Sequence, residues 1–538
     1  MRRLVLVLVF LLPLLLLAQQ EFADPPVVPG DLPGFWTDSD TSDSLQYNAG
    51  GVVGAVTVDG ITYSQIRFRP ELNFGKVGIC LDLDFLIDGD GRFRQQDWEN
   101  FKDYVGKLFY FRYGRRNDFF YMKTGCISDY TLGHGLIFNN FSNTLYYPEE
   151  KNIGTYIGIN TDISGLGGEL YTHDLFRNQI LAGKVYAKPF QHLNAAWLQE
   201  LRMGLNMGWD RDQLARFPDT DGDGVPDIYD KFPKNPNLAA DTDNDGIPDE
   251  EDWDINGNGF IDGPSNPAVD ATFPGIHDYY PSYPFDNDYQ QDYLFRYKKR
   301  KSVLIFSMDY ELPLVDDDDF KLSHYAEVAK IRSHGAGFVF PGFGAKYSVF
   351  EAKLEFRRFE KGFLPSFFDR TYEGKRSELK VELRESTPDD STRSGRVYWL
   401  STKDEVLATI NPTMGWFGYL QADLSEILVL KMAYQDMYGK DMKAGKSLWF
   451  KASLNPKFIP KFKQANFYYS QVNADYLDFR HPRNVNAQVV GELIYSIAPN
   501  ANLIGKYTEH YTDINNDGRI KGKKEVKEIL SFGVEFIF

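Results

Sequence analysis

The sequence predicts an all-β protein that forms a transmembrane antiparallel β-barrel of roughly 16 to 20 strands, interrupted by an irregular acidic insert. Two observations predict this fold class. Many short segments alternate apolar with polar residues, and several of the polar faces carry full charges. After the first 18 residues, no stretch is long and apolar enough for a transmembrane helix, so any insertion into a membrane must be through strands.

The end of the chain, Val526 to Phe538, carries the clearest alternation. Successive side chains of a strand point to opposite faces, so one face here is apolar and the other is polar or small. The apolar face consists of Leu530, Phe532, Val534, Phe536 and Phe538, opposite Ser531, Gly533 and Glu535. Such a strand, ending on an aromatic residue, resembles the closing strand of bacterial outer-membrane β-barrels. The resemblance implies that the barrel-assembly machinery recognises this strand and that outer-membrane lipid surrounds the barrel.

The same alternation recurs along the chain, in residues 77–85, 153–160, 201–209, 304–311, 351–357 and 486–495. A soluble sandwich would bury the charges of these segments between its sheets at high cost, whereas a membrane barrel turns them toward a wet lumen. A large secreted β-sandwich or propeller is the alternative fold. The charges expected to face the lumen are Asp82, Asp84, Lys353, Glu355, Arg357 and Glu492.

Residues 1–18 have the features of a secretory signal peptide. Two arginines precede an apolar run from Leu4 to Leu17, which is too short to span a bilayer comfortably, and the small residue Ala18 follows. The alternative is a retained single-span anchor. It is disfavoured because a polar, Pro-rich lead-in over residues 19–45 follows at once.

Composition narrows the function. The formal net charge of -17 argues against a nucleic-acid partner, because nucleic acids select basic surfaces.

The chain has two cysteines, Cys80 and Cys126. A secreted compartment would permit a disulfide between them, but geometry decides whether they pair, and the sequence leaves this open.

The insert, residues 210–300, separates two barrel segments at residues 46–209 and 301–538. Short connections such as Gly75–Lys76 alternate with longer ones such as residues 88–102. In membrane barrels the short turns are periplasmic and the long loops are extracellular. Following that alternation, we expect the insert to be extracellular.

Three copies of an aspartate-rich motif lie in the insert. The first copy spans Asp219 to Asp230 and the second Asp241 to Asp252, and a degenerate third begins at Asp254. Oxygen ligands at positions 1, 3 and 5, followed by a glycine, are typical of the first half of a calcium-binding loop. The ten aspartates of the first two copies would repel one another without counter-ions, so we expect calcium to fold the insert. The alternative is a solvated acidic linker.

The spacing of these copies, with a proline before the later aspartate, resembles thrombospondin type 3 repeats over residues 217–263. Family members bind calcium through their aspartates, so the resemblance implies Ca²⁺ ligands at the matching positions. These candidates are Asp219, Asp221, Asp223, Asp227, Asp230, Asp241, Asp243, Asp245, Asp249 and Asp252, with Asp254, Asn256, Asn258 and Asp262 in the weaker third copy.

Enzyme signatures such as G-x-S-x-G, H-E-x-x-H or a phosphate loop do not occur in the sequence, so we expect no enzymatic activity. His134, between two glycines, is interpreted as a hydrogen-bonding structural residue. The aromatic segment 363–370 is expected to fold into the lumen or to pack at the rim.

The first functional hypothesis is a porin-like channel for passive diffusion of small solutes or ions. The alternative is a calcium-dependent adhesion protein, anchored by the barrel and binding an extracellular protein or matrix partner.

Overall fold

The computed structural model describes residues 46–58, 61–116, 118–127, 130–145, 151–249, 252, 254–257, 259, 293–294, 301–384, 395–424, 427–439, 445–454, 459–474, 477, 483, 487–498, 501–511, 520 and 525–537. The chain divides into two compact units. The first unit comprises residues 1–209, 304–371 and 407–538, and the second comprises residues 210–303 and 372–406. The predicted signal peptide, the lead-in at 19–45, and Phe538 lie outside the described residues.

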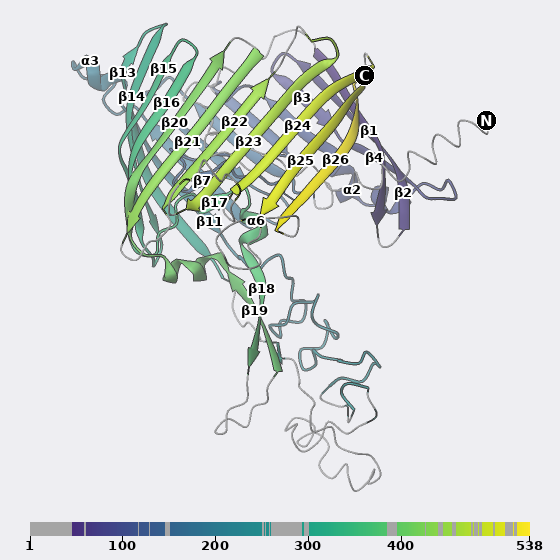
Figure 1. The fold of residues 1–538 in the computed structure, drawn as a ribbon. Helices are drawn as coiled ribbons and strands as arrows, with labels where there is room; N and C mark the ends of the chain where they lie inside the picture. The colour runs from purple at the N-terminus through teal and green to yellow at the C-terminus, as the bar shows by residue number, and fades with distance from the viewer. Residues whose placement is uncertain are drawn as a thin grey trace. The chain divides into compact units, whose positions relative to one another are not determined.

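A single large sheet forms the first unit, and the alternating segments of the sequence are its strands (Figure 1). Its first half contains β1 (Gln46–Val58), β2 (Ile61–Phe74), β3 (Val77–Leu81), β4 (Leu83–Ile87), β5 (Leu108–Tyr113), β6 (Phe120–Gly125), β8 (Gly154–Asn160), β9 (Gly167–Thr172), β10 (Ile180–Ala187) and β11 (Arg202–Asp210). Its second half contains β13 (Val303–Asp316), β14 (Phe320–Ile331), β15 (Ala336–Tyr347), β16 (Phe350–Phe359), β20 (Thr413–Leu424), β21 (Leu428–Gly439), β22 (Lys446–Leu454), β23 (Phe462–Ala474), β24 (Ala487–Ala498), β25 (Ala501–Tyr511) and β26 (Val526–Ile537).

The first and last strands pair with each other, which closes the sheet into a barrel. β26 pairs antiparallel with β25 along its whole length and with β1 from Gly50↔Ile537 to Val52↔Glu535. β3 and β4 both pair with β2 in continuous register and are two pieces of one strand, interrupted at Asp82. Within the described residues, the 21 strands of the sheet therefore correspond to about 20 strand paths. The predicted antiparallel barrel is confirmed, at the upper end of the expected size.

Side chains alternate between the two faces of the wall as predicted. On β11, Leu205 is 63% exposed whereas its neighbour Asn206 is 4% exposed. On β16, Leu354 is 53% exposed whereas Glu355 is 3% exposed. Large apolar side chains thus point outward and polar ones point inward. This is the arrangement of a transmembrane barrel, whose outer face contacts lipid.

Two connections of the barrel fold back against its inner wall. The first is a hairpin between β6 and β8, Tyr130–Phe141, which we call the inner hairpin; Tyr130 and Phe141 exchange two backbone hydrogen bonds of 2.9 Å. The second is the segment Phe363–Asp369 between β16 and β20, which we call the strap. The two meet where β7 (Phe138–Asn139) of the inner hairpin pairs in parallel with β17 (Phe368–Asp369) of the strap.

Short helices occur in the remaining connections: η1 (Gln95–Trp98), α2 (Phe101–Val105) and α3 (Ala196–Gln199). Among the described residues, no helix is both long and apolar enough to cross a membrane. The two cysteines, Cys80 and Cys126, are both buried and are not joined by a disulfide, so the pairing that the sequence left open does not form here.

The second unit contains the whole insert, residues 210–300, and a segment of the region 301–538 that was predicted to be barrel. Residues 372–406 form α6 (Tyr372–Lys375), the antiparallel hairpin of β18 (Ser377–Arg384) and β19 (Gly395–Thr402), and η2 (Lys403–Thr409). The short β12 (Tyr293–Leu294) of the insert pairs in parallel with β19. The region 301–538 is therefore not barrel throughout, because β18 and β19 form a separate sheet with β12.

A buried ion pair joins the two segments of the second unit. The guanidinium of Arg376 lies 3.4 Å from the carboxylate of Asp210, and the exposed fractions of these side chains are 4% and 0%. The hydroxyl of Tyr372 donates a 2.8 Å hydrogen bond to the same carboxylate. Arg376 also donates to the backbone oxygen of Asp212 at 2.6 Å. The start of the insert is thus attached to α6.

Candidate functional site

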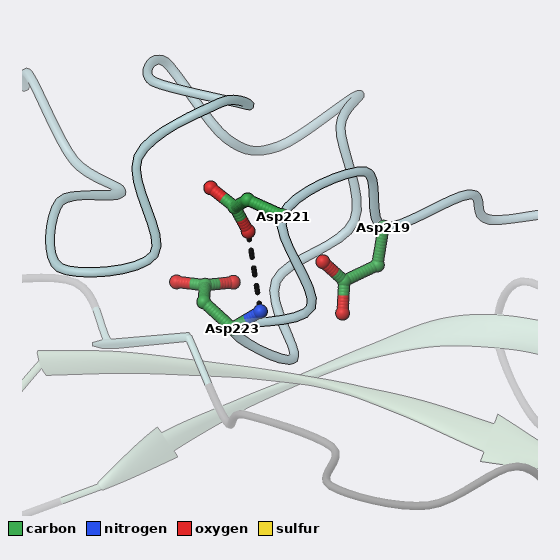
Figure 2. Close-up of side chains that lie close together, drawn as sticks. All are labelled: Asp219, Asp221 and Asp223. Carbon is green, nitrogen blue, oxygen red and sulfur yellow. Dashed lines mark hydrogen bonds between the residues drawn. The ribbon is translucent and has the colours of Figure 1, made fainter.

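The first aspartate-rich copy brings three carboxylates to one place. Oxygen atoms of Asp219, Asp221 and Asp223 all lie within 4.8 Å of one another, and Figure 2 shows the three side chains around one turn of the loop. The second copy repeats the cluster with Asp241, Asp243 and Asp245, again within 4.8 Å. Positions 1, 3 and 5 of both copies, which the sequence singled out, are therefore brought together.

The loop forms because the first aspartate of each copy binds backbone N–H groups further along. Asp219 accepts hydrogen bonds from Gly222 and Gly224, at 2.8 and 2.9 Å. In the equivalent contacts, Asp241 accepts from Gly246 at 3.1 Å and Asp254 accepts from Gly259 at 2.7 Å. Gly224, Gly246 and Gly259 have φ values of 93°, 92° and 82°, a conformation that favours glycine. All three copies therefore use the same turn.

A second contact closes each of the first two loops. Asp227 accepts hydrogen bonds from both the N–H and the hydroxyl of Thr220, at 2.7 and 2.6 Å. Asp249 accepts the same pair from Thr242, both at 2.7 Å. The threonine at the second position of the motif is a functional residue that the sequence reasoning missed. Its recurrence in both copies was the available signal.

Two further acidic candidates lie buried beside the clusters. Asp230 and Asp252 are 6% and 3% exposed. Burial raises the pKa of Asp230, a shift that the nearby carboxylates of Asp221 and Asp223 increase. Burial likewise raises the pKa of Asp252, and the charges of Asp245 and Asp243 add to that shift. Each is therefore within electrostatic reach of carboxylates of its cluster.

The remaining candidates differ in how far the structure places them. Burial raises the pKa of Asp249, although its hydrogen bonds from Thr242 oppose the shift. Asp254 and Asn256 lie in the turn of the third copy and are partly buried. Asn258 and Asp262 lie outside the described residues.

Unpartnered carboxylate oxygens show that these loops suit a hard cation. Asp221 Oδ2, Asp230 Oδ2 and Asp241 Oδ1 are each buried without a hydrogen-bond partner. Buried polar atoms normally have partners, and a cluster of anionic oxygens with spare lone pairs is costly unless a cation neutralises it. Oxygen-rich, all-carboxylate surroundings are those that Ca²⁺ prefers. The residues present therefore fit a bound calcium ion.

The predicted lumen charges are paired across the inner wall. Arg67 on β2 binds Asp82 through two hydrogen bonds of 2.8 Å, and Lys151 contacts the same carboxylate at 3.3 Å. On β16, Arg357 binds Glu355 at 2.6 Å. Three other predicted charges also face inward. Asp84 accepts a hydrogen bond from Gln65, and Glu492 accepts one from Asn466. Lys353 lies on β16 in the same inward-facing row as Glu355 and Arg357.

A polar network that the sequence did not single out fixes the tip of the inner hairpin. Lys184 on β10 lies 3.1 Å from Asp309 on β13, which accepts a 2.6 Å hydrogen bond from Asn206. Asn206 also donates to Ser307, whose hydroxyl donates to Glu327 on β14 at 2.7 Å. The alternation of side chains along each strand is enough to predict that these residues face inward. The contacts between them could not be predicted, because these depend on the register of neighbouring strands.

His134 has the structural role that its setting suggested. Its ring stacks on Tyr325 with centroids 4.3 Å apart, and its Nε2 lies 3.2 Å from the backbone oxygen of Tyr310. Its backbone N–H donates to Glu327 at 2.9 Å. The aromatic segment 363–370 packs inside as well, with Phe363, Phe367 and Phe368 at most 1% exposed.

Comparison with known proteins finds similar barrels among solved structures, whereas no family model and no curated protein matches the chain. A variant of the ferric enterobactin receptor PfeA from Pseudomonas aeruginosa, in complex with enterobactin, shares 10% identity over 92% of this chain and 82% of that chain, with a TM-score of 0.33. The copper transporter OprC shares 8% over 93% and 81%, with a TM-score of 0.34. OccK2 (OpdF) from Pseudomonas aeruginosa, in complex with glucuronate, shares 8% over 92% and 98%, with a TM-score of 0.29. Similarity at this level says nothing of a shared ligand.

Proposed function

We propose that the protein is an outer-membrane, porin-like channel through which small solutes or ions diffuse passively. The observation that carries this proposal is the division of the wall into an apolar outer face and a polar inner face lined by charged pairs. Barrels of 16 to 18 strands already leave an aqueous path, and this barrel has about 20. Pairs such as Arg67 with Asp82 would set the ion preference of that path.

The lengths of the connections support an extracellular insert. Turns of two or three residues join β2 to β3, β13 to β14, and β15 to β16. The connection of β6 to β8, the connection of β16 to β20, and the insert between β11 and β13 are far longer. Because antiparallel strands alternate in direction, all three long connections leave from the same rim, opposite the short turns. In membrane barrels the long connections are extracellular.

Calcium is the proposed ligand of the insert. Asp219, Asp221 and Asp223 would hold one ion and Asp241, Asp243 and Asp245 a second. Buried Asp230 and Asp252 would add oxygen ligands to the first and second clusters. The ion would neutralise carboxylates that otherwise repel one another, and its binding free energy would become folding free energy of the insert.

Conductance in planar lipid bilayers tests the channel. The purified full-length protein, shown to be folded by its heat-dependent migration on gels, should produce stable unitary currents in potassium chloride. A silent bilayer with a verified folded barrel would overturn the channel. Repeating the recording with calcium and then with a chelator tells whether the insert affects the current.

A second candidate function is calcium-dependent adhesion, in which the barrel serves as an anchor for the insert. The repeated, preformed aspartate loops favour it, since a passive pore does not require a connection of this length. The partner would be an extracellular protein or a matrix component. Calcium-dependent retention of whole cells on matrix-coated surfaces, lost when residues 217–263 are deleted, would support adhesion, and unchanged retention would exclude it.

A further inference from the structure

The inner hairpin and the strap occupy the inside of a barrel that would otherwise be wide. We propose that these two segments together form a plug that limits permeation, and that Glu327 is the positioning residue that holds it against the wall. This inference rests on the proposed channel function and assigns the part of the channel that restricts flow. All the residues concerned belong to the first unit.

The root of the inner hairpin is fixed between β6 and β8. Asn143, which is 1% exposed, accepts a 2.7 Å hydrogen bond from the N–H of Ile127. Its amide nitrogen donates to the backbone oxygens of Gly125, Asn152 and His173, at 3.0 to 3.1 Å. One side chain therefore attaches the hairpin to strand ends on both sides of it. These hydrogen bonds fix the direction in which the inner hairpin leaves the wall.

The tip of the inner hairpin is held by a side chain of β14, several strands along the wall from β6 and β8. A single oxygen of Glu327, on β14, accepts hydrogen bonds from the N–H groups of His134 and Leu136, at 2.9 and 3.3 Å. The other oxygen accepts from Ser307. Glu327 itself is 2% exposed. Removing a buried acceptor leaves its backbone N–H donors without a partner, which is costly, so the loss of Glu327 should release the tip.

The strap joins the inner hairpin and extends it across the lumen. The N–H groups of Ser366 and Phe368 donate to the backbone oxygens of Leu136 and Ile137, at 2.9 and 3.0 Å. The rings of Phe138 and Phe368 stack with centroids 4.3 Å apart. Two connections that are more than 200 residues apart in the sequence thus form one hydrogen-bonded and aromatic unit.

Glycines on the inner wall provide the space that the plug occupies. A Cβ atom at Gly208 of β11 would approach the side chains of Ile137 and Phe138 to 2.6 and 2.7 Å. A Cβ atom at Gly337 of β15 would approach Phe363 to 2.1 Å. Side chains at these positions would displace the plug. The wall is therefore complementary to the two segments, as in a packed core.

Single-channel recording of the full-length protein tests the plug. In the shortened variant, an Asn-Gly turn replaces residues 131–140. Such a turn suits the site because Tyr130 and Phe141 already exchange backbone hydrogen bonds. Its unitary conductance should exceed that of the wild type roughly two-fold or more, since the inner hairpin no longer fills its share of a lumen that, at this strand number, holds a wide aqueous path.

Three point variants isolate the role of Glu327. Glu327→Ala should raise the conductance or make the current fluctuate, because the tip loses its acceptor. Glu327→Gln keeps an acceptor oxygen for His134 and Leu136 and should restore the wild-type current. Glu200→Ala, which removes an exposed glutamate that pairs with Lys188 in the connection of β10 to β11, should leave the unitary conductance unchanged. Heat-dependent gel migration confirms that each barrel is folded.

Each outcome has a distinct meaning. A larger current in the shortened variant supports the plug. A wild-type current in Glu327→Gln, together with an altered current in Glu327→Ala, supports Glu327 as the positioning residue. Equal currents in the wild type and the shortened variant would overturn the plug and leave the channel standing. Silence of both proteins, when both are folded, would overturn the channel and the plug together. If the current of Glu327→Gln is altered in the same way as that of Glu327→Ala, the assignment of Glu327 as the positioning residue is overturned.

Discussion

The carboxylate of Asp227 accepts two hydrogen bonds from a single residue, Thr220, through its backbone N–H and its hydroxyl, at 2.7 and 2.6 Å. The second copy of the motif repeats this contact between Asp249 and Thr242. The contact closes a loop whose inner aspartates carry unpartnered oxygens. The motif is therefore a structural unit that shapes an anionic cavity, which a linker has no reason to repeat.

Replacing the hydroxyl of this contact should weaken calcium binding. Thr220→Val keeps the shape of the side chain but removes one donor to Asp227, so this candidate ligand loses part of its support. Loss of such an outer contact typically lowers metal affinity about 10-fold. Calorimetric titration of the full-length protein with calcium measures the change. Thr161→Val, which removes a hydroxyl that bonds Leu166 in the barrel unit, is the control and should leave the titration unchanged.

Removing calcium should expose the insert to proteases while the barrel stays resistant. Without the ion, the clustered aspartates of the two loops repel one another, and little apolar surface remains to hold the segment. Limited proteolysis with and without chelator, followed by mass spectrometry, should place the new cleavage sites within residues 217–263. Identical cleavage patterns in calcium and in chelator would contradict a metal-folded insert.

Breaking the buried ion pair of the second unit should destabilise it strongly. Arg376→Ala would leave the carboxylate of Asp210 buried with only the hydroxyl of Tyr372 as a side-chain partner. Removing one partner of a buried pair costs about 3–5 kcal/mol. Lys380→Ala, which breaks the exposed pair with Glu378, should cost about 0–1 kcal/mol. Hydrogen exchange of peptides from the second unit compares the two; equal protection in both variants would contradict the prediction.

Removing the arginine from the paired charges on β2 should change ion selectivity. In Arg67→Ala, the carboxylate of Asp82 loses the guanidinium that lies 2.8 Å from it, so the lumen becomes more negative. The reversal potential in a potassium chloride gradient should move toward cation preference. Arg92→Ala removes an arginine whose side chain is 78% exposed and is the matched control. A reversal potential that moves equally in both variants would show that Asp82 does not face the conducting path.

An added methyl group should disturb the plug when it lies on the inner wall at Gly208, and not when it lies on the outer face at Gly491. The Cβ atom of Gly208→Ala would crowd Ile137, Phe138 and Phe368, which should cost about 1–3 kcal/mol as an overpacked core does. Gly491→Ala, on β24, adds the same methyl group where no atom lies within 4 Å. Unfolding in urea, followed by gel migration, measures both. Equal urea concentrations at the two unfolding midpoints would contradict the prediction, since the plug would then accommodate a methyl group at Gly208 without loss of stability.

The strands were predictable because their alternation is local. Leu205 and Leu354 point outward as the period of two requires, and the aspartates at positions 1, 3 and 5 gather because a single turn joins them. The plug was not predictable, since Glu327 and His134 are separated by 193 positions and meet only through the register of the barrel. The hairpin of β18 and β19 was counted with the barrel because the sequence of a strand does not tell which sheet it joins, and this hairpin pairs with β12 instead.

Solute flux through the folded barrel tests the central claim most directly. Liposomes that contain the purified full-length protein would be diluted into isotonic solutions of neutral solutes of increasing size, and swelling would be followed by light scattering. We expect rapid swelling with the smallest solutes, a steep decline as solute size increases, and no swelling of protein-free liposomes. Folded protein that produces no swelling with any solute would contradict a channel and leave the barrel as an anchor for the insert.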